Sequence, residues 1–265
     1  MSRTASATAA DRARQVFVTA SYLLGIVGVL FGVGVLGTRV EESPGGDLSD
    51  DATLMAPHGP AFSIWSLIYV LLTAYVIWQW LPAQAADERH RRIGWLAAVS
   101  IVLNAAWLLV TQQGWIWGSL AVIVVLALVL IAIMAQLHSA TRTTTQQTWL
   151  DTVAVDVTFG LYLGWVLAAT GANLGAGLAS SDMEPGRWTS VGLVVAVTLV
   201  GAALLRLFSG QLSIAAALGW GLFWIAYGRL FDEPADTVVG IVAAGCLIVI
   251  LGVAALSQGR RAQIR

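Results

Sequence analysis

The stretch WIWGSLAVIVVLALVLIAIMAQL, residues 115–137, decides the fold class of this chain. It runs for 23 residues without a charged side chain. A helix needs about 20 mostly apolar residues to cross the roughly 30 Å hydrocarbon core of a bilayer. The stretch therefore predicts a membrane-spanning helix.

Seven further apolar stretches flank this one. The first has an apolar run of about 22 residues, longer than the roughly 7–15 of a signal-peptide core, so we expect it to be retained. Only Gln112–Gly114 separates the third stretch from the fourth, which predicts a tight hairpin. The chain thus predicts an all-α integral membrane protein with eight transmembrane helices, at residues 16–37, 60–81, 93–111, 115–137, 152–174, 189–208, 212–230 and 237–257.

Composition supports a membrane protein and excludes several functions. Charged residues make up 11% of the chain, whereas an ordinary soluble domain is about 25% charged. The net charge of −1 is unlike the basic surface of a nucleic-acid-binding protein, so the expected partner is the lipid bilayer and not nucleic acid. The chain contains no lysine, which excludes a Schiff base to pyridoxal phosphate or retinal. The single cysteine, Cys246, excludes an internal disulfide.

Arginine is distributed unequally between the two sets of connections. Eleven arginines fall in the tails and the even-numbered connections, and three fall in the odd-numbered ones. Because cationic segments stay in the cytoplasm, we expect a multi-pass protein of the plasma or inner membrane with both termini cytoplasmic. Arg206 and Arg229 lie at helix ends, where their side chains are expected to extend to the lipid headgroups.

Three stretches carry more specific information. Residues 57–69 read PHGPAFSIWSLIY, with Trp65 and Tyr69 four residues apart on one helix face. Residues 103–107 read LNAAW. Residues 162–165 read YLGW, and Asn173 follows eight residues after Trp165. Two of these side chains are amides within predicted spans, where lipid offers no hydrogen-bond partner, so each amide must face protein, water or a ligand.

These motifs resemble those of the TspO/MBR family, the tryptophan-rich sensory proteins related to the mitochondrial translocator protein. Members have a proline-rich first loop leading into W-x3-Y, an L-N-x2/3-W motif in the third helix and Y-L-x-W-x7-N in the fifth. Gly114-Trp115 is also similar to the Gly-Trp that begins the fourth helix of the family. The chain departs from the pattern at Gly59, where the family has Trp, and at Ser63, where it has Pro.

The resemblance implies a five-helix bundle over residues 16–176. Residues 177–257 then form an additional three-helix membrane segment, with cytoplasmic tails at residues 1–15 and 258–265. It further implies a pocket near the outer face that takes a flat hydrophobic molecule, such as a porphyrin, haem or a sterol. No cofactor is assigned. The ligand-binding residues it implies are Trp65, Tyr69, Asn104, Trp107, Trp115, Trp165 and Asn173.

The predicted topology places most of these residues near the outer face of the membrane. In an antiparallel bundle the second helix begins near the outer face, while the third and fifth helices end there. Trp165 lies eight residues before Asn173, about 12 Å deeper at 1.5 Å per residue, and is expected to form the pocket floor. The second half of the loop at residues 38–59 is expected to fold over the outer mouth. The alternative is that these aromatic residues simply pack together without a cavity.

Sensing or regulation through ligand binding is the leading functional hypothesis. A transporter of small hydrophobic molecules and a porphyrin-modifying enzyme are the alternatives, although no catalytic or metal-ligating set is visible. Asp156 is the one carboxylate within a predicted span, and coupled carriers usually need more buried charge. Trp220 and Trp224 extend the pocket or form a subunit interface, which leaves a homodimer open.

Overall fold

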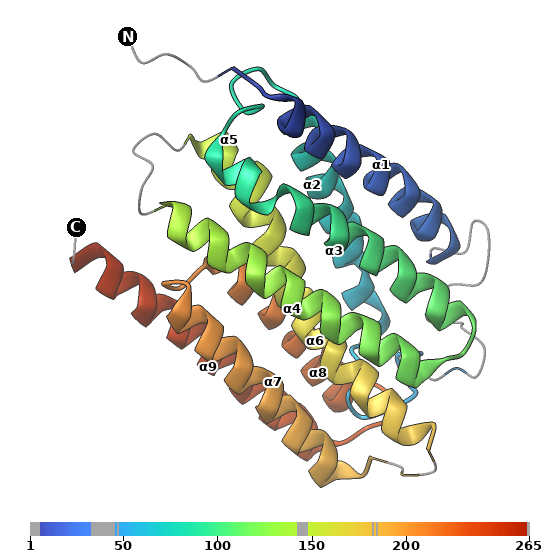
Figure 1. The fold of residues 1–265 in the computed structure, drawn as a ribbon. Coiled ribbons are helices and arrows are strands. Elements are labelled where there is room, and N and C mark those ends of the chain that lie inside the picture. Colours follow the sequence, from blue (N-terminus) through green and yellow to red (C-terminus); the bar gives the residue numbers. More distant parts are fainter. Residues whose placement is uncertain are drawn as a thin grey trace.

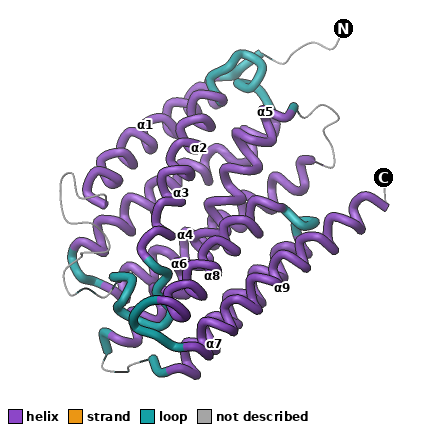
Figure 2. The backbone as a smooth tube through the Cα atoms, turned by 180° about the vertical axis from the view of Figure 1, so that it is seen from behind, coloured by secondary structure: helices purple, strands orange, loops and turns teal. Residues whose placement is uncertain are grey.

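The computed structural model describes residues 6–32, 46, 48–141, 148–181, 183 and 185–263. Every regular element within these ranges is a helix, so the all-α prediction is confirmed for them (Figures 1 and 2). The elements are α1 (Ala9–Gly32), the 3-10 helix η2 (Gly59–Ser63), α2 (Ile64–Trp78), α3 (Glu88–Gln112), α4 (Ile116–Thr141), α5 (Trp149–Asp151), the π-helix η3 (Thr152–Val157), α6 (Thr158–Ala179), α7 (Arg187–Leu207), α8 (Leu212–Phe231) and α9 (Thr237–Gln263).

Seven helical segments of the described chain are long and apolar enough to cross a membrane. They correspond to the second through eighth predicted spans. The first predicted span corresponds to α1, but its residues 33–37 lie outside the described residues, so the count of eight stays a prediction. The seven segments are Gly59–Trp78, Glu88–Gln112, Ile116–Ala140, Trp149–Ala179, Arg187–Leu207, Leu212–Phe231 and Thr237–Gly259.

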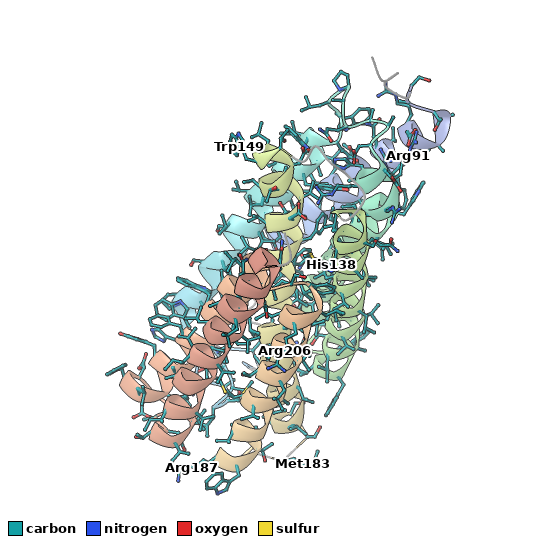
Figure 3. All side chains as sticks on the ribbon, turned by 90° about the vertical axis from the view of Figure 1, so that its left-hand side faces the viewer. Arg91, His138, Trp149, Met183, Arg187 and Arg206 are labelled. Carbon is teal, nitrogen blue, oxygen red and sulfur yellow. The ribbon has the colours of Figure 1, made fainter. Side chains whose placement is uncertain are left out.

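The described chain begins and finishes at the same end of the bundle. α1 starts at this end and α9 returns to it (Figures 1 and 2). Figure 3 shows Arg91 and Trp149 at this end, and Met183 and Arg187 at the other. We call the first the terminal end and the second the distal end.

A turn glycine and a helix-contact glycine help to fix how α1, α3 and α4 pack. The α3–α4 connection is the tight hairpin that the sequence predicts, and Gly114 within it has φ of +67°, a left-handed conformation that glycine adopts without strain. α3 packs between α1 and α4. A Cβ atom at Gly28 would lie 2.9 Å from the Cβ of Ala105, so α1 and α3 approach each other as closely as a glycine permits.

The centre of the bundle is α6, which packs against α4, α7 and α8. A Cβ atom at Gly164 would collide with the backbone carbonyl of Ile214, and one at Gly221 would lie 2.6 Å from the Cβ of Ala168. Glycines on both helices therefore let α6 and α8 pack backbone to backbone. The additional segment at residues 177–257 shares this interface with the expected five-helix bundle.

α5, η3 and α6 form one continuous helix with a π turn near the terminal end. Within that turn Asp156 pairs with Arg89 of α3 at 2.6 Å, and both side chains are largely buried. A π turn leaves backbone carbonyls without their usual helical partner. Ser213 Oγ of α8 donates to the Asp156 carbonyl at 3.3 Å, so the start of α8 satisfies the group that the π turn releases.

A cluster of charged side chains joins α1 to α3 at the terminal end. Arg91 donates to both carboxylate oxygens of Asp11, at 2.8 and 2.7 Å. Arg14, itself buried, donates to the Ala85 carbonyl in the α2–α3 connection at 2.9 Å. The hydrogen bond from Arg91 holds the pKa of Asp11, which precedes the first predicted span, well below its usual range.

Candidate functional site

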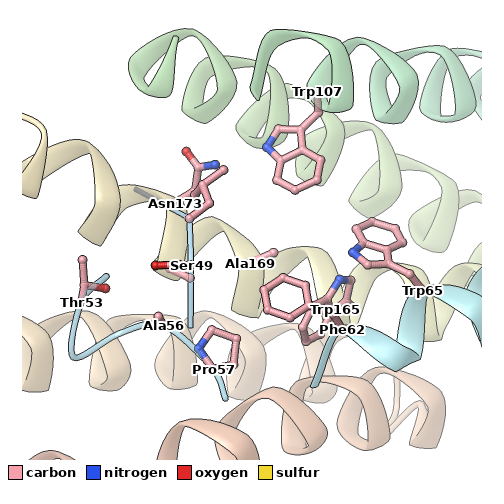
Figure 4. Close-up of a pocket in the computed structure, with 12 residues that line it drawn as sticks. Ser49, Thr53, Ala56, Pro57, Phe62, Trp65, Trp107, Trp165, Ala169 and Asn173 are labelled. Carbon is pink, nitrogen blue, oxygen red and sulfur yellow. The ribbon is translucent and has the colours of Figure 1, made fainter. Parts of the chain in front are cut away.

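A loop segment covers the distal end of the bundle between α1 and α2. We call residues 48–63 the lid. It folds back over the ends of α3 and α6, and beneath it lies a cavity that we call the lid pocket. Figure 4 shows Thr53, Ala56 and Pro57 of the lid facing Trp65, Trp107 and Asn173 across this hollow. The pocket is lined by Leu48, Ser49, Thr53, Ala56, Pro57, Phe62, Trp65, Trp107, Trp165, Ala169, Ala172 and Asn173.

Aromatic rings form the deep wall of the lid pocket. Trp65 lies at the centre of this wall, because its ring centroid is 6.3 Å from that of Trp107 and 6.2 Å from that of Trp165. Phe62 of the lid meets Trp165 edge to face at 6.0 Å. Such tilted and edge-to-face pairs are favourable arrangements of aromatic rings. The aromatic cluster thus gives the lid pocket a rigid apolar wall.

Polar groups in the wall are few, and two of them are buried without a partner. The indole Nε1 atoms of Trp107 and Trp165 make no hydrogen bond within the described part of the chain. Asn173 is different, because its amide is paired with the Ser119 hydroxyl at 3.1 Å. A buried donor without a partner is costly, so these two N–H groups suit a ligand that carries hydrogen-bond acceptors.

The lid pocket is small as it stands. Its volume is about 30 Å³, which is room for about two water molecules. A porphyrin or sterol does not fit unless the lid or the Phe62 and Trp65 rings move. We call the observed arrangement, which has no room for such a ligand, closed.

A second cavity lies beside the first, between α1, α2 and α3. Tyr69 and Asn104, two of the predicted site residues, line this cavity of about 130 Å³ instead of the lid pocket. The Tyr69 hydroxyl donates to Asn104 Oδ1 at 3.2 Å. Tyr69 also stacks on Trp65 at a centroid distance of 5.4 Å, so this stacked pair forms the wall between the two spaces.

The structure thus places six of the seven predicted residues in two neighbouring cavities. Trp65, Trp107, Trp165 and Asn173 line the lid pocket, and the other two line the neighbouring cavity. Trp115 is the exception. It precedes the first turn of α4, it is 66% exposed, and it lines neither space.

α8 holds the lid in place, a contact that was not predicted from the sequence. Arg229 is 1% exposed and donates to the carbonyls of Thr53 and Asp50, at 3.1 and 3.2 Å. The expectation that Arg229 extends to lipid headgroups is therefore wrong. Its guanidinium has two backbone acceptors in the lid, and these replace the solvation that the headgroups would have offered.

Two tryptophans of α8 also contact the lid. Trp220 donates from Nε1 to the Ala61 carbonyl at 2.9 Å, and the Trp224 carbonyl accepts from the His58 N–H at 3.3 Å. The imidazole of His58 lies 3.2 Å from Asp232, just after α8. In this structure these tryptophans brace the lid from outside, while Trp65 and Trp107 line the pocket.

One feature of the sequence is consistent with this contact between α8 and the lid. Arg229 is a cation in the last turn of an apolar helix, and the first loop supplies partners for it only if the chain folds α8 against that loop. Within the described ranges no group of three or more His, Cys, Asp or Glu side chains is arranged to hold a metal ion.

Comparison with known proteins gives one finding. The sequence model of one protein family, described as TSPO-like protein, matches residues 15–256. The match extends beyond the expected residues 16–176 and includes α7, α8 and most of α9. Comparisons with curated proteins and with solved structures gave no match.

Proposed function

This chain belongs to the TSPO-like protein family, and on that premise we propose that it binds a flat hydrophobic ligand under the lid as a sensory or regulatory membrane protein. The proposed ligand class is porphyrin-like or sterol-like, bearing at least one hydrogen-bond acceptor. The proposed location is the plasma or inner membrane, with both termini in the cytoplasm and the lid outside. The arginine asymmetry supports this orientation.

One observation carries the proposal. Three tryptophans from three different helices, Trp65, Trp107 and Trp165, face one space beneath a loop, and two of their indole N–H groups are buried without a partner. Packing alone would favour apolar side chains or satisfied indoles at such positions, because an unsatisfied buried donor costs about 1–3 kcal/mol. A ligand with an acceptor group offers these donors a partner.

Lid movement is part of the proposed function. Because the closed pocket holds only about 30 Å³, we propose that a flat ligand enters when the lid separates from α3 and α6 and the Phe62 and Trp65 rings adjust. The lid is tied to α8 through Arg229 and Trp220, so ligand entry changes contacts on α8 as well. This coupling gives a sensor two distinguishable states, which supports sensing or regulation as the proposed function.

Proton- or ion-coupled transport is less well supported. Asp156 is the carboxylate expected to matter for coupling, and it forms a close ion pair with Arg89 near the terminal end. Asp156 lies in η3 and Asn173 lies further along the same continuous helix, in α6, roughly 25 Å away at 1.5 Å per residue. The proposal therefore assigns Asp156 to stabilising the helix bundle.

A titration with protoporphyrin IX tests the proposal on the purified protein in lipid nanodiscs. Tryptophan fluorescence reports binding, and the Trp107→Phe and Trp165→Phe variants keep an aromatic ring while removing one N–H each. We expect each variant to bind at least about tenfold more weakly, the effect of losing one buried hydrogen bond. Trp149→Phe is the control, since Trp149 is exposed at the terminal end. Equal affinity in the pocket variants and the control, or no quenching at micromolar porphyrin, would refute the proposal.

A further inference from the structure

We propose that the cavity between α1, α2 and α3 is a second binding site, for a small neutral ring-sized molecule that carries one hydrogen-bond acceptor, such as an aryl ketone. This site differs from the lid pocket in position, size and ligand. It is lined by Tyr22 and Ile26 of α1, Tyr69 and Leu72 of α2, and Ile101 and Asn104 of α3.

The size of the cavity suits one ring. Its volume is about 130 Å³, more than four times the 30 Å³ of the lid pocket. An engineered apolar cavity of about 150 Å³ stays dry and binds benzene. The larger space in this structure is thus matched to a single-ring molecule and is too small for a porphyrin or a sterol.

Tight packing surrounds the cavity, so the space is not a sign of loosely packed helices. A Cβ atom at Gly25, which borders the cavity, would lie 2.8 Å from Ile101. One turn further on, Gly28 lies equally close to Ala105. α1 therefore packs closely against α3 on both sides of Ile26. The cavity lies between these two close contacts, where the lining side chains leave space unfilled.

One polar group in the wall lacks a partner. Asn104 is 5% exposed, and its Oδ1 accepts from Tyr69. Its Nδ2 is buried and makes no hydrogen bond with the described residues. A side-chain amide has two N–H donors, and leaving them unpaired in an apolar environment is unfavourable. A carbonyl or ether oxygen of a ligand would supply the missing acceptor, which defines the ligand class.

Access from the bilayer supports a hydrophobic ligand. Ile26 lines the cavity and is 39% exposed on the outer surface of α1, in a helix that the sequence predicts to span the membrane. A small apolar molecule partitions into lipid, so it reaches this wall without passing the lid. The stacked Trp65 and Tyr69 rings separate the site from the lid pocket, and the two sets of lining residues do not overlap.

The chain offers a selective readout for this site. It contains only two asparagines, Asn104 and Asn173, and each lines a different cavity. Protein labelled with ¹⁵N-asparagine therefore shows two side-chain amide groups in an NMR spectrum, one for each space. We expect acetophenone, added to the protein in nanodiscs, to shift the Asn104 signals and leave those of Asn173 unchanged. Ethylbenzene, which has a similar shape but no acceptor, should cause a smaller shift at Asn104.

Two α1 variants identify where the probe binds. Ile26→Phe adds bulk inside the cavity and should weaken the acetophenone response of Asn104 at least tenfold. Val27→Phe adds the same kind of bulk to the neighbouring residue, which is 48% exposed and does not line the cavity, and should leave the response unchanged. Equal responses in the two variants, equal shifts by the two probes, or an acetophenone shift at Asn173 alone would overturn the proposal. None of these outcomes depends on porphyrin binding under the lid.

Discussion

Replacing Arg229 should release the lid. Its guanidinium donates to two lid carbonyls, those of Thr53 and Asp50, from a position in α8 that is almost completely buried. Arg229→Met keeps a long aliphatic side chain but removes every donor. The carbonyls of Thr53 and Asp50 then accept hydrogen bonds from water, and the closed lid loses two charge-assisted hydrogen bonds.

The size of the effect follows from the two bonds. A hydrogen bond to a charged group contributes about 1.5–3 kcal/mol, so two bonds at the low end contribute about 3 kcal/mol to the closed lid. At about 1.4 kcal/mol per factor of ten, the open population rises roughly 100-fold. Amide hydrogen exchange measures this population directly. The His58 N–H, bonded to the Trp224 carbonyl, and the Gly59 N–H, bonded to Asp50, are the reporting amides.

A matched variant separates lid release from general destabilisation. Arg187 at the start of α7 pairs with Asp236 at 2.7 Å but contacts no lid residue among the hydrogen bonds of the described chain. Arg187→Met should therefore leave exchange at His58 and Gly59 unchanged. Exchange of these amides that is no faster in Arg229→Met than in wild type, or equally fast in both variants, would refute the role of Arg229 as the lid anchor.

Three further predictions concern the bundle itself. Gly164→Ala should destabilise the α6–α8 interface by about 1–3 kcal/mol, since its Cβ collides with the α8 backbone; thermal unfolding of that variant measures this. Arg89→Met should lower stability by about 3 kcal/mol because it removes the buried ion pair with Asp156, and an effect no larger than that of replacing an exposed arginine would count against the pair. The lowered pKa of Asp11 means that its ion pair with Arg91 stabilises the folded state above about pH 4 and is lost as the pH falls further. Asp11→Asn should therefore flatten the acid side of the stability profile, and an unchanged slope would contradict this.

The membrane helices could be predicted well because the bilayer sets their length. About 20 apolar residues are needed wherever the helix packs, so the segments from Gly59 to Gly259 could be recognised without knowledge of tertiary structure. The motif resemblance also assigned Trp165 and Asn173, eight residues apart on α6, to one pocket. Both line the lid pocket.

The rest of the site depends on contacts between distant segments, which spacing does not encode. Asn104 and Trp107 are only one helical turn apart, yet the Trp65–Tyr69 stack places them in different cavities. Arg229 lies 176 residues from Thr53, so its role depends on how α8 packs beside the lid. Trp115 follows the tight hairpin and remains outside the bundle, although a motif resemblance placed it in the pocket.

The most direct test of ligand binding under the lid is a porphyrin titration of ¹⁵N-asparagine-labelled protein in nanodiscs. Asn173 lines the lid pocket beside Trp107 and Trp165, and Asn104 lies behind the Trp65–Tyr69 wall. Protoporphyrin IX is expected to shift the Asn173 side-chain signals saturably at micromolar concentration, with a much smaller change at Asn104. Asn173 signals that stay in place at saturating porphyrin would contradict binding under the lid.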